Sequence, residues 1–317
     1  MDPQNILLFS CPQIEQVAFE MMTLRGGKGI LEKGTIDWNH FPDGTPNFQV
    51  LDSARLKDRD VAFLACFDSM GAAMEQLLTI ASIARRHALR SLKIILPYYP
   101  TGTKDRWEEP GEVVTSLELA RMMQFIPRPE ASRVELVTYD IHALQEESFF
   151  PDNIRVSLQS AIPELLEHLR GLENIAIAFP DEGAGKRFKQ YFKNYPLIYC
   201  DKRREHHKRS VWIREGDPRG KHVFIVDDLI LSGGTAIAAK GSLIEAGALE
   251  VSLFATHGVF PNESWKQVAE AGFSEVWISD SCPMMASVIR GQKPFKIVSL
   301  APILTDLLAQ EFSVVRR

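Results

Sequence analysis

The sequence has few cysteines, and their spacing suggests no site. Its 317 residues include four cysteines, at positions 11, 66, 200 and 282, and none belongs to a C-x-x-C pair. Zinc sites and disulfide frameworks need cysteines at short or regular spacings, so the sequence predicts neither. A reducing compartment is the simplest setting for such a chain.

Long hydrophobic runs and the features of a signal peptide are also missing. No apolar run approaches the roughly 18 residues of a membrane span. The opening residues, MDPQNILLFSCPQIEQ, carry neither a positively charged start nor a small-residue cleavage site. We therefore expect no membrane partner and a cytoplasmic location, or an organellar one if a transit peptide has been removed.

Positive charge is in slight deficit. Lys and Arg number 36 against 41 Asp and Glu, which gives a net charge of -5. An acidic balance disfavours a general polyanion binder, so we expect no nucleic-acid partner. Any basic cluster in this chain should then be local and specific.

What the sequence does contain is the alternation of strands and helices of an α/β protein. Hydrophobic residues make up 45% and charged residues 24%, as in ordinary compact proteins. Short apolar runs predict buried strands, and between them apolar residues recur every three or four positions, as in amphipathic helices. The predicted strands are 6–10, 61–67, 92–99, 134–140, 175–179, 223–230, 251–260 and 276–281, and the clearest helices are 74–89, 115–125 and 239–247.

The length suggests two domains of roughly 150 residues each. The least regular connection lies near 149–157, so we place an N-terminal domain at 1–152 and a C-terminal domain at 153–317. A last helix, at about 300–312, can pack back on the first domain. The predicted fold is α/β, with two doubly wound parallel-sheet domains, in which ligands bind beyond the carboxyl ends of the strands.

The sharpest motif is VFIVDDLILSGGTAIAAK at 223–240. An apolar strand runs into Asp227 and Asp228, and a short loop leads to Gly-Gly-Thr (233–235) at a helix start. Backbone N–H groups there form a seat for a phosphate, and adjacent carboxylates can accept hydrogen bonds from the vicinal hydroxyls of a ribose. The pattern predicts a ribose 5-phosphate site, with an ordinary strand-to-helix turn as the alternative.

A second strand runs into a small-residue turn in IAIAFPDEGAGKR at 175–187. Pro180 and Arg187 stand where a Walker A loop has Gly and Ser or Thr, so that assignment fails. What remains is Asp181, a carboxylate that can hold Mg²⁺, beside small residues suited to diphosphate oxygens. A plain strand-to-helix turn is an equal alternative.

His142 follows the predicted strand at 134–140. A lone histidine is more often structural than functional, and Mg²⁺ prefers oxygen ligands. Its position at the carboxyl end of a strand nevertheless makes it a candidate.

The densest positive charge is the run DKRREHHKRS at 201–210. A nucleic-acid patch is the usual interpretation of such a run, but no aromatic residues interleave it. A mobile loop that closes over a triphosphate fits better, because phosphoryl transfer needs positive charge at the transition state. A solvated surface loop is the alternative.

Two irregular loops complete the set of candidates. The loop at 97–112 is rich in Pro and Gly and carries two basic residues, and the loop at 40–48 turns at Asp43-Gly44 between two phenylalanines. Either can be a plain loop or hairpin, although an exposed phenylalanine could also stack on an adenine.

Taken in order, these motifs resemble the ribose-phosphate diphosphokinases, also called phosphoribosyl diphosphate (PRPP) synthetases. The resemblance rests on FPDG at 41–44, the loop at 97–112, YDIHALQ at 139–145, FPDEGAGKR at 179–187, DKRR at 201–204 and VDDLILSGGT at 226–235. The amino-acid sequences of the loops are most similar to those of the plant-type, phosphate-independent class II branch. The family forms homo-oligomers, so we expect one here.

The resemblance implies transfer of the β,γ-diphosphoryl group of ATP to the C1 hydroxyl of ribose 5-phosphate, with PRPP and AMP as products. It implies Mg²⁺ as cofactor, held by His142 and Asp181, and Lys202 and Arg204 as the catalytic pair. The implied ribose 5-phosphate residues are Asp227, Asp228, Leu231, Ser232, Gly233, Gly234 and Thr235; the diphosphate loop is Asp181, Glu182, Gly183 and Ala184; and the ATP residues are Phe41, Asp43, Gly44, Thr45, Lys104 and Arg106. Phe41 and its neighbours would contact adenine from the same or a neighbouring subunit.

Departures from the common class I pattern fall mainly in nucleotide recognition. Pro100-Thr101-Gly102 replaces Arg-Gln-Asp, Thr45 replaces an acidic residue, and Leu231 replaces an acidic residue in the phosphate seat. Strict ATP preference and control by phosphate and ADP are therefore open, and another nucleoside triphosphate is an alternative substrate. A catalytically silent regulatory subunit and a phosphoribosyltransferase are the competing functions.

Overall fold

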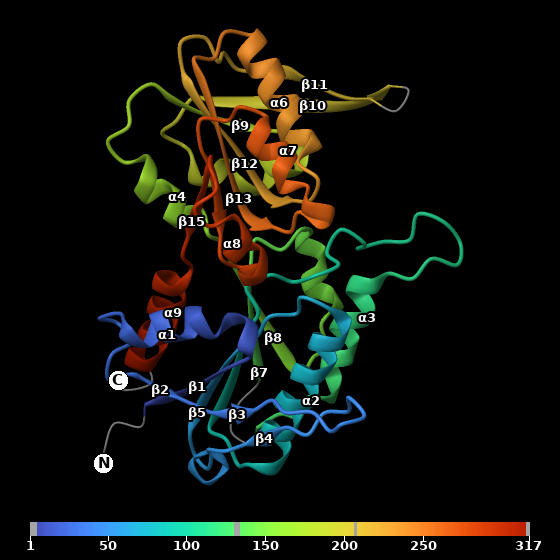
Figure 1. Ribbon diagram of the computed structural model, residues 1–317, viewed down its shortest axis with the longest axis vertical. Coiled ribbons are helices and arrows are strands. Elements are labelled where there is room, and N and C mark those ends of the chain that lie inside the picture. Colours follow the sequence, from blue (N-terminus) through green and yellow to red (C-terminus); the bar gives the residue numbers. More distant parts are fainter. Residues whose placement is uncertain (1–4, 130–133, 206–207, 315–317) are drawn as a thin grey trace. The chain divides into compact units, whose positions relative to one another are not determined.

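The computed structural model describes residues 5–129, 134–205 and 208–314, with side chains except at 203–210 and 311–314. The chain divides into two compact units, one of residues 1–159 with 300–317 and the other of residues 160–299 (Figure 1). Each unit is built on its own parallel sheet, as the sequence predicts for an α/β protein.

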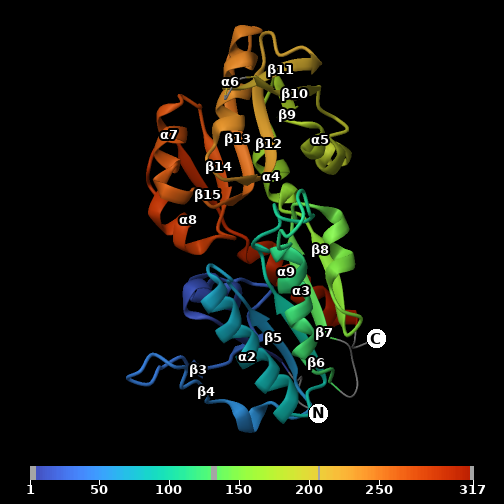
Figure 2. The same cartoon turned by 90° about the vertical axis from the view of Figure 1, so that its right-hand side faces the viewer.

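The first unit has a six-stranded sheet in the order β2-β1-β5-β6-β7-β8, parallel throughout. Its central strands are almost wholly apolar because both faces are covered by helices. The helices α1 and α9 lie on one face and α2 and α3 on the other (Figures 1 and 2). The strands are β1 (Ile6–Ser10), β2 (Leu31–Lys33), β5 (Asp60–Leu64), β6 (Ser91–Ile95), β7 (Val134–Tyr139) and β8 (Ile154–Gln159), and the helices are α1 (Glu15–Thr23), α2 (Met70–Arg86), α3 (Thr115–Met122) and α9 (Ala301–Val314).

Short elements complete this unit. An antiparallel ribbon of β3 (Ile36–Asp37) and β4 (Gln49–Val50) carries the loop at 40–48. The 3-10 turns are Pro12–Ile14, Ser53–Arg55, Met123–Phe125 and Leu144–Phe149. Helix α2 illustrates why these residues form a helix. Ser69 caps it by accepting a 3.1 Å hydrogen bond from the Ala72 N–H, and its buried residues recur at helical spacing.

The second unit has a seven-stranded sheet in the order β11-β10-β9-β12-β13-β14-β15, in which only the β10–β11 pair is antiparallel. Helix α5 lies on the face opposite α6, α7 and α8 (Figure 2). The strands are β9 (Ile175–Phe179), β10 (Leu197–Glu205), β11 (Lys208–Glu215), β12 (His222–Ile230), β13 (Glu250–Gly258), β14 (Val276–Ser279) and β15 (Phe295–Val298), and the helices are α4 (Ile162–Leu169), α5 (Glu182–Phe188), α6 (Gly234–Glu245), α7 (Trp265–Glu270) and α8 (Pro283–Ile289), with 3-10 turns at Lys189–Tyr191 and Pro261–Glu263.

In the structure, the boundary between the two units lies at a later residue than predicted. We expected the first domain to end at 152, but β8 pairs with β7 from Val134↔Ile154 to Tyr139↔Gln159, so the first unit continues to residue 159. The last helix, which we predicted at about 300–312 as able to pack back on the first domain, does so. Helix α9 belongs to the first unit, where the Thr305 hydroxyl lies 3.4 Å from the Met21 carbonyl oxygen of α1.

The basic run at 201–210 is not the loop that we predicted. Its residues form the ends of β10 and β11, which pair as an antiparallel hairpin that extends beyond the rest of the sheet (Figure 1). Residues 206 and 207, between the two strands, lie outside the described residues. The β-branched and aromatic residues near the base of the hairpin favour strands, and charge alone did not reveal this.

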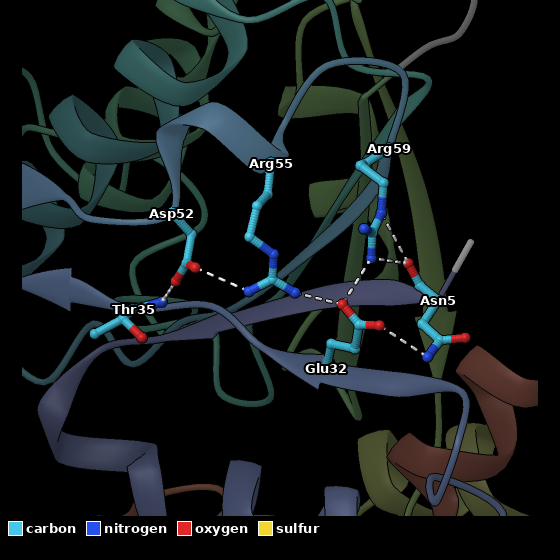
Figure 3. Close-up of polar contacts among 6 residues, drawn as sticks. All are labelled: Asn5, Glu32, Thr35, Asp52, Arg55 and Arg59. Atoms are coloured by element: carbon cyan, nitrogen blue, oxygen red, sulfur yellow. Dashed lines mark hydrogen bonds and ion pairs between the residues drawn. The ribbon is translucent and has the colours of Figure 1, made fainter. Parts of the chain in front are cut away.

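A network of ions and hydrogen bonds joins the edge of the first sheet to the segment before β5 (Figure 3). Glu32 of β2 accepts hydrogen bonds from Arg59 at 3.0 Å, from the Asn5 side chain at 3.0 Å and from Arg55. Arg55 also pairs with Asp52 at 2.8 Å. The hydrogen bond from Arg59, helped by the charges of both arginines, holds the pKa of the Glu32 carboxyl below its ordinary 4.5, although burial opposes the shift.

We expect Glu32→Gln to lower the melting temperature at neutral pH by about 1–3 °C, since partly exposed ion pairs contribute about 0.2–1 kcal/mol. A carboxyl with a lowered pKa stabilises the fold above its unfolded pKa of about 4.5 and loses that effect as the pH falls through its folded pKa. The difference between variant and wild type should therefore shrink below pH 4.5 in thermal unfolding. Glu15→Gln is the matched control, because Glu15 pairs with Lys33 of the same strand but both side chains are 56% exposed. An equal loss in both variants, or a difference that does not change with pH, would contradict this account of the network.

Candidate functional site

The loop between β12 and α6 has the backbone of a phosphate seat. Gly233 has a φ of +78°, which favours glycine, and an added Cβ there would lie 2.3 Å from Val268 Cγ2. The first hydrogen bond of α6 runs from the Ile237 N–H to the Gly233 carbonyl at 2.9 Å. The N–H groups of Gly234 and Thr235 come before that bond and have no acceptor within the helix.

The two aspartates of β12 differ in their surroundings. The strand continues to Ile230, so Asp227 and Asp228 lie within it and not at its end. The Asp228 N–H donates to Asp227 Oδ1 at 3.0 Å, and the two carboxyl groups lie close enough to affect each other. Asp228 is 3% exposed and forms a 2.9 Å ion pair with Arg187 of α5. Asp227 is half-buried. Asp228 is thus anchored by an ion pair and Asp227 is the more accessible of the two, while the role of both at the ribose hydroxyls stays a prediction.

Strand register brings Asp181 and Lys202 to the same edge of the sheet. Phe179 of β9 lies opposite Tyr199 of β10, and both functional residues come just after that pair. Lys202 forms an ion pair with the Asp181 carboxylate, whose other oxygen accepts the Ala184 N–H at 2.9 Å. Burial alone would raise the pKa of Asp181, but the hydrogen bonds from Lys202 and Ala184 and the charge of Lys202 outweigh it and hold the pKa below its ordinary value.

The pKa of Asp227 is shifted in the opposite direction to that of Asp181. Burial raises its pKa, and the nearby carboxylates of Asp228 and Asp181 raise it further, while Lys202 opposes them. The carboxylate of Asp181, just after β9, thus lies near those of Asp227 and Asp228 in the last part of β12, with Lys202 and Arg187 as the cations beside them. Such an arrangement favours ligands that bring positive charge or hydroxyl donors to Asp227.

The predicted diphosphate loop is the first turn of α5. Asp181 is the N-cap, and Glu182, Gly183 and Ala184 are the first helical residues. Glu182 is exposed and pairs with Lys186 at 2.8 Å. The turn is therefore more regular than the small-residue nest that the sequence suggested. Arg204 lies in β10 opposite Arg209, and its side chain falls outside the described residues.

In the first unit, the segment at 41–45 is a closed turn. Thr45 donates from its N–H and its hydroxyl to Asp43 Oδ1, at 2.9 and 2.7 Å, and these bonds lower the pKa of Asp43. Gly44 has a φ of +83°. The turn leaves the Phe41 side chain exposed. An exposed aromatic ring on a rigid turn is suited to stacking on a flat ligand.

The loop at 97–112 holds its lysine in an internal ion pair. Lys104 Nζ lies 2.7 Å from Glu112 Oε1. The other Glu112 oxygen accepts the N–H groups of Glu108 and Glu109, and the bonds from Lys104 and these N–H groups lower the pKa of Glu112 to about 2. Arg106 is exposed. The predicted role of Lys104 at nucleotide phosphates stays a prediction, and here its charge is paired within its own loop.

His142 is exposed and follows β7, as predicted. It lies beside the same loop, because a Cβ added at Gly102 would be 3.2 Å from His142 Cβ. His142 belongs to the first unit and Asp181 to the second. Within the ranges that the structure describes, no three His, Cys, Asp or Glu side chains gather as metal ligands. The magnesium site formed by His142 and Asp181 therefore stays a prediction.

Sequence reasoning missed two partners of the predicted residues, Arg187 and Glu112. Arg187 was noted only as a departure from a Walker loop. It shares the inward face of α5 with the buried Ala184 and Phe188, and a cation on such a face needs a buried anion, which was the available signal. Glu112 gave no local signal, because its partners depend on how the loop folds.

We expect Gly233→Ala to destabilise the protein by about 2–4 kcal/mol, from the left-handed backbone and the overlap with Val268. Adding Val268→Ala removes the overlap but not the strain. The double variant should then lose about 1 kcal/mol less stability than the sum of the losses in the two single variants. Chemical denaturation measures all three. Gly241→Ala, at an open position of α6, should be neutral or stabilising, and a strictly additive double variant would show that Val268 does not confine the loop.

The chain resembles known proteins over nearly its whole length. A family model described as "Phosphoribosyl synthetase-associated domain" matches residues 203–312. Ribose-phosphate pyrophosphokinase 3, chloroplastic, of Oryza sativa subsp. japonica is 42% identical over 315 residues, which cover 96% of this chain and 76% of that relative. Ribose-phosphate pyrophosphokinase 4 of the same organism is 39% identical over 315 residues, 96% of each chain.

A solved structure agrees with this relationship. The crystal structure of phosphoribosylpyrophosphate synthetase from Mycobacterium smegmatis matches with a TM-score of 0.79 and 25% sequence identity, over 98% of this chain and 99% of that one. In the described part of this chain, no helix is long and apolar enough to cross a membrane. The family predicted from the ordered motifs is confirmed, and the chain belongs to the ribose-phosphate pyrophosphokinases, a family of enzymes.

Proposed function

We propose that the protein transfers the β,γ-diphosphoryl group of ATP to the C1 hydroxyl of ribose 5-phosphate, forming PRPP and AMP. The observation that carries this proposal is the Asp181–Lys202 ion pair beside Asp227, Asp228 and the Gly233 loop in one unit. In this arrangement a lysine that can bind diphosphate oxygens lies near carboxylates that can accept hydrogen bonds from ribose hydroxyls. The N–H groups of the nearby loop can bind the ribose phosphate.

Ribose 5-phosphate binds in this proposal at the start of α6. The N–H groups of the loop from Leu231 to Thr235 receive the 5-phosphate, and Ser232 adds a hydroxyl. Asp227 accepts hydrogen bonds from the ribose hydroxyls. Asp228 supports the site from within the strand, since its ion pair with Arg187 holds its side chain in place.

In the chemical step, the C1 oxygen of ribose 5-phosphate forms a bond to the β-phosphorus of ATP. The bond from that phosphorus to the oxygen shared with the α-phosphorus breaks, AMP leaves with this oxygen, and the proton of the C1 hydroxyl passes to solvent water. Such a transfer depends on positioning and on neutralising charge more than on covalent catalysis. Lys202 and Arg204 supply the positive charge on the transferring group.

Asp181 is a suitable ligand for a magnesium ion bound to the ATP phosphates. Mg²⁺ is usually held by one or two carboxylates together with phosphate oxygens, and it would neutralise charge on the triphosphate. Asp181 is an oxygen donor whose lowered pKa keeps it ionised. His142 is the second proposed ligand. Lys202 then exchanges the Asp181 carboxylate for the diphosphate oxygens.

The first unit is proposed to supply nucleotide contacts. Phe41 stacks on the base with the Asp43-Gly44-Thr45 turn beneath it, and Lys104 and Arg106 reach the phosphates after Lys104 leaves Glu112. The turn can serve the same subunit or a neighbouring one, because we propose a homo-oligomer. A cytoplasmic location stays a prediction, with an organelle as its alternative, since the rice relative's name places that protein in the chloroplast.

A catalytically silent regulatory subunit is the second candidate. The description of the family model, a synthetase-associated domain, favours it. The ion pairs at Asp181 and Asp228 favour the enzyme, because a subunit without catalysis has no need of a lysine and two paired carboxylates at one sheet edge.

We expect the purified protein to form AMP and PRPP from ATP, Mg²⁺ and ribose 5-phosphate without added inorganic phosphate. The plant-type loops are the reason for expecting phosphate independence. Product analysis by chromatography checks this, with a panel of other nucleoside triphosphates in place of ATP. Activity that appears only with phosphate would exclude the class II assignment, and inactivity under both conditions would favour the silent subunit.

Lys202→Ala should lower kcat by about 10²- to 10⁴-fold, because a charge that stabilises the transition state is lost, while ribose 5-phosphate still binds with similar affinity. Initial rates and calorimetric titration measure the two effects. Lys296→Ala is the matched control, since Lys296 is also a half-exposed lysine on a strand of this sheet, paired with Glu275. If turnover survives in Lys202→Ala, the basic hairpin does not have the proposed role.

A further inference from the structure

Ser264 stands at the start of α7 but does not cap that helix. A serine at this position usually accepts a hydrogen bond from the first N–H groups of its own helix. Here the side chain makes no such bond, and its Oγ donates to the Leu231 carbonyl oxygen at 3.0 Å. The residue is only 7% exposed, so water competes little for this bond. The hydroxyl thus supports the loop between β12 and α6.

The segment that delivers Ser264 has a strained backbone. Phe260, Asn262 and Glu263 have φ values of 45°, 54° and 56°, in the left-handed region that residues other than glycine rarely adopt. The buried ring of Phe260 holds the segment, because it packs edge-to-face on Phe295 at 5.8 Å between centroids. Strain of this kind persists only where the surrounding structure imposes it, and it gathers at ligand sites.

The bond from Ser264 sets the direction of one peptide. In a planar trans peptide the carbonyl and the following N–H point in opposite directions. Because the Leu231 carbonyl is directed at Ser264, the Ser232 N–H points away from α7. Leu231 and Ser232 are both exposed, so a ligand can approach this part of the loop.

Two more contacts tie the same segments together. The Val259 N–H donates to the Ile230 carbonyl at 3.0 Å, and the Val268 side chain occupies the space where a Cβ on Gly233 would lie. The segment from β13 to α7 thus confines the seat loop at Ile230, Leu231 and Gly233. Among these contacts, the hydrogen bond from the Ser264 side chain is the one that orients the Ser232 N–H. A substitution can remove this side chain and leave the backbone unchanged.

We infer that Ser264 is a positioning residue for ribose 5-phosphate, which directs the Ser232 N–H toward the 5-phosphate by holding the Leu231 carbonyl. The inference rests on the proposed function and adds to it a residue outside the seat loop. Ser264 does not touch the reacting atoms. Its loss therefore weakens ribose 5-phosphate binding and leaves the diphosphoryl transfer nearly unchanged.

The test compares Ser264→Ala, Ser264→Thr and wild type. We expect Ser264→Ala to raise both the KM and the calorimetric Kd for ribose 5-phosphate by about 5- to 10-fold, the effect of one lost hydrogen bond. The kcat and the KM for ATP should stay within about 2-fold, and Ser264→Thr, which keeps the hydroxyl, should restore binding. Ser69→Ala is the matched control, because Ser69 caps α2 in the usual way, and its loss should lower stability without changing ribose 5-phosphate binding.

The outcomes separate this inference from the proposed function. If wild type makes PRPP and Ser264→Ala binds ribose 5-phosphate as wild type does, the inference is wrong and the proposed function stands. If Ser264→Ala lowers kcat and stability together without a selective change in ribose 5-phosphate binding, Ser264 is merely structural and the inference is also wrong. A wild type that binds no ribose 5-phosphate overturns both.

Discussion

Parallel pairing of β9 with β10 on one side and β12 on the other is the constraint on which the site of the second unit depends. Parallel strands end at the same edge of a sheet, so residues distant in sequence meet there when their strands are neighbours. The registers Phe179↔Tyr199 and Ile225↔Ala178 place Asp181, Lys202 and Asp228 just beyond paired residues. A slip of one residue would turn these side chains to the other face.

Electrostatics then gives each of these groups a distinct character. Asp181 has a lysine partner and a lowered pKa, Asp228 has a partly buried arginine partner, and Asp227 has carboxylate neighbours and a raised pKa. Three like charges at one edge would repel strongly in a half-buried site, and the two cations offset that repulsion. In the proposed reaction, Lys202 exchanges its Asp181 partner for the transferring group, which would link ligand binding to the movement of one side chain.

Much of the architecture followed from local patterns. The runs at 6–10 and 175–179 are β1 and β9 as predicted, and the predicted helices correspond to α2, α3 and α6, because buried strands and amphipathic helices have strong local periodicity. The boundary near 152 was wrong because β8 is held by its ladder with β7, a non-local interaction. The basic run was wrongly taken for a loop because pairing of β10 with β11 decides its structure, and charge does not report on pairing.

The sequence by itself determined the family and the identity of the chemical groups, since ordered motifs with Asp181, Lys202 and the Gly233 loop are local strings of residue types. Only the tertiary structure decided how those groups are paired. Arg187 with Asp228, Glu112 with Lys104 and Ser264 with Leu231 are contacts between separate segments. Each depends on distance and direction in space, which a one-dimensional pattern does not contain.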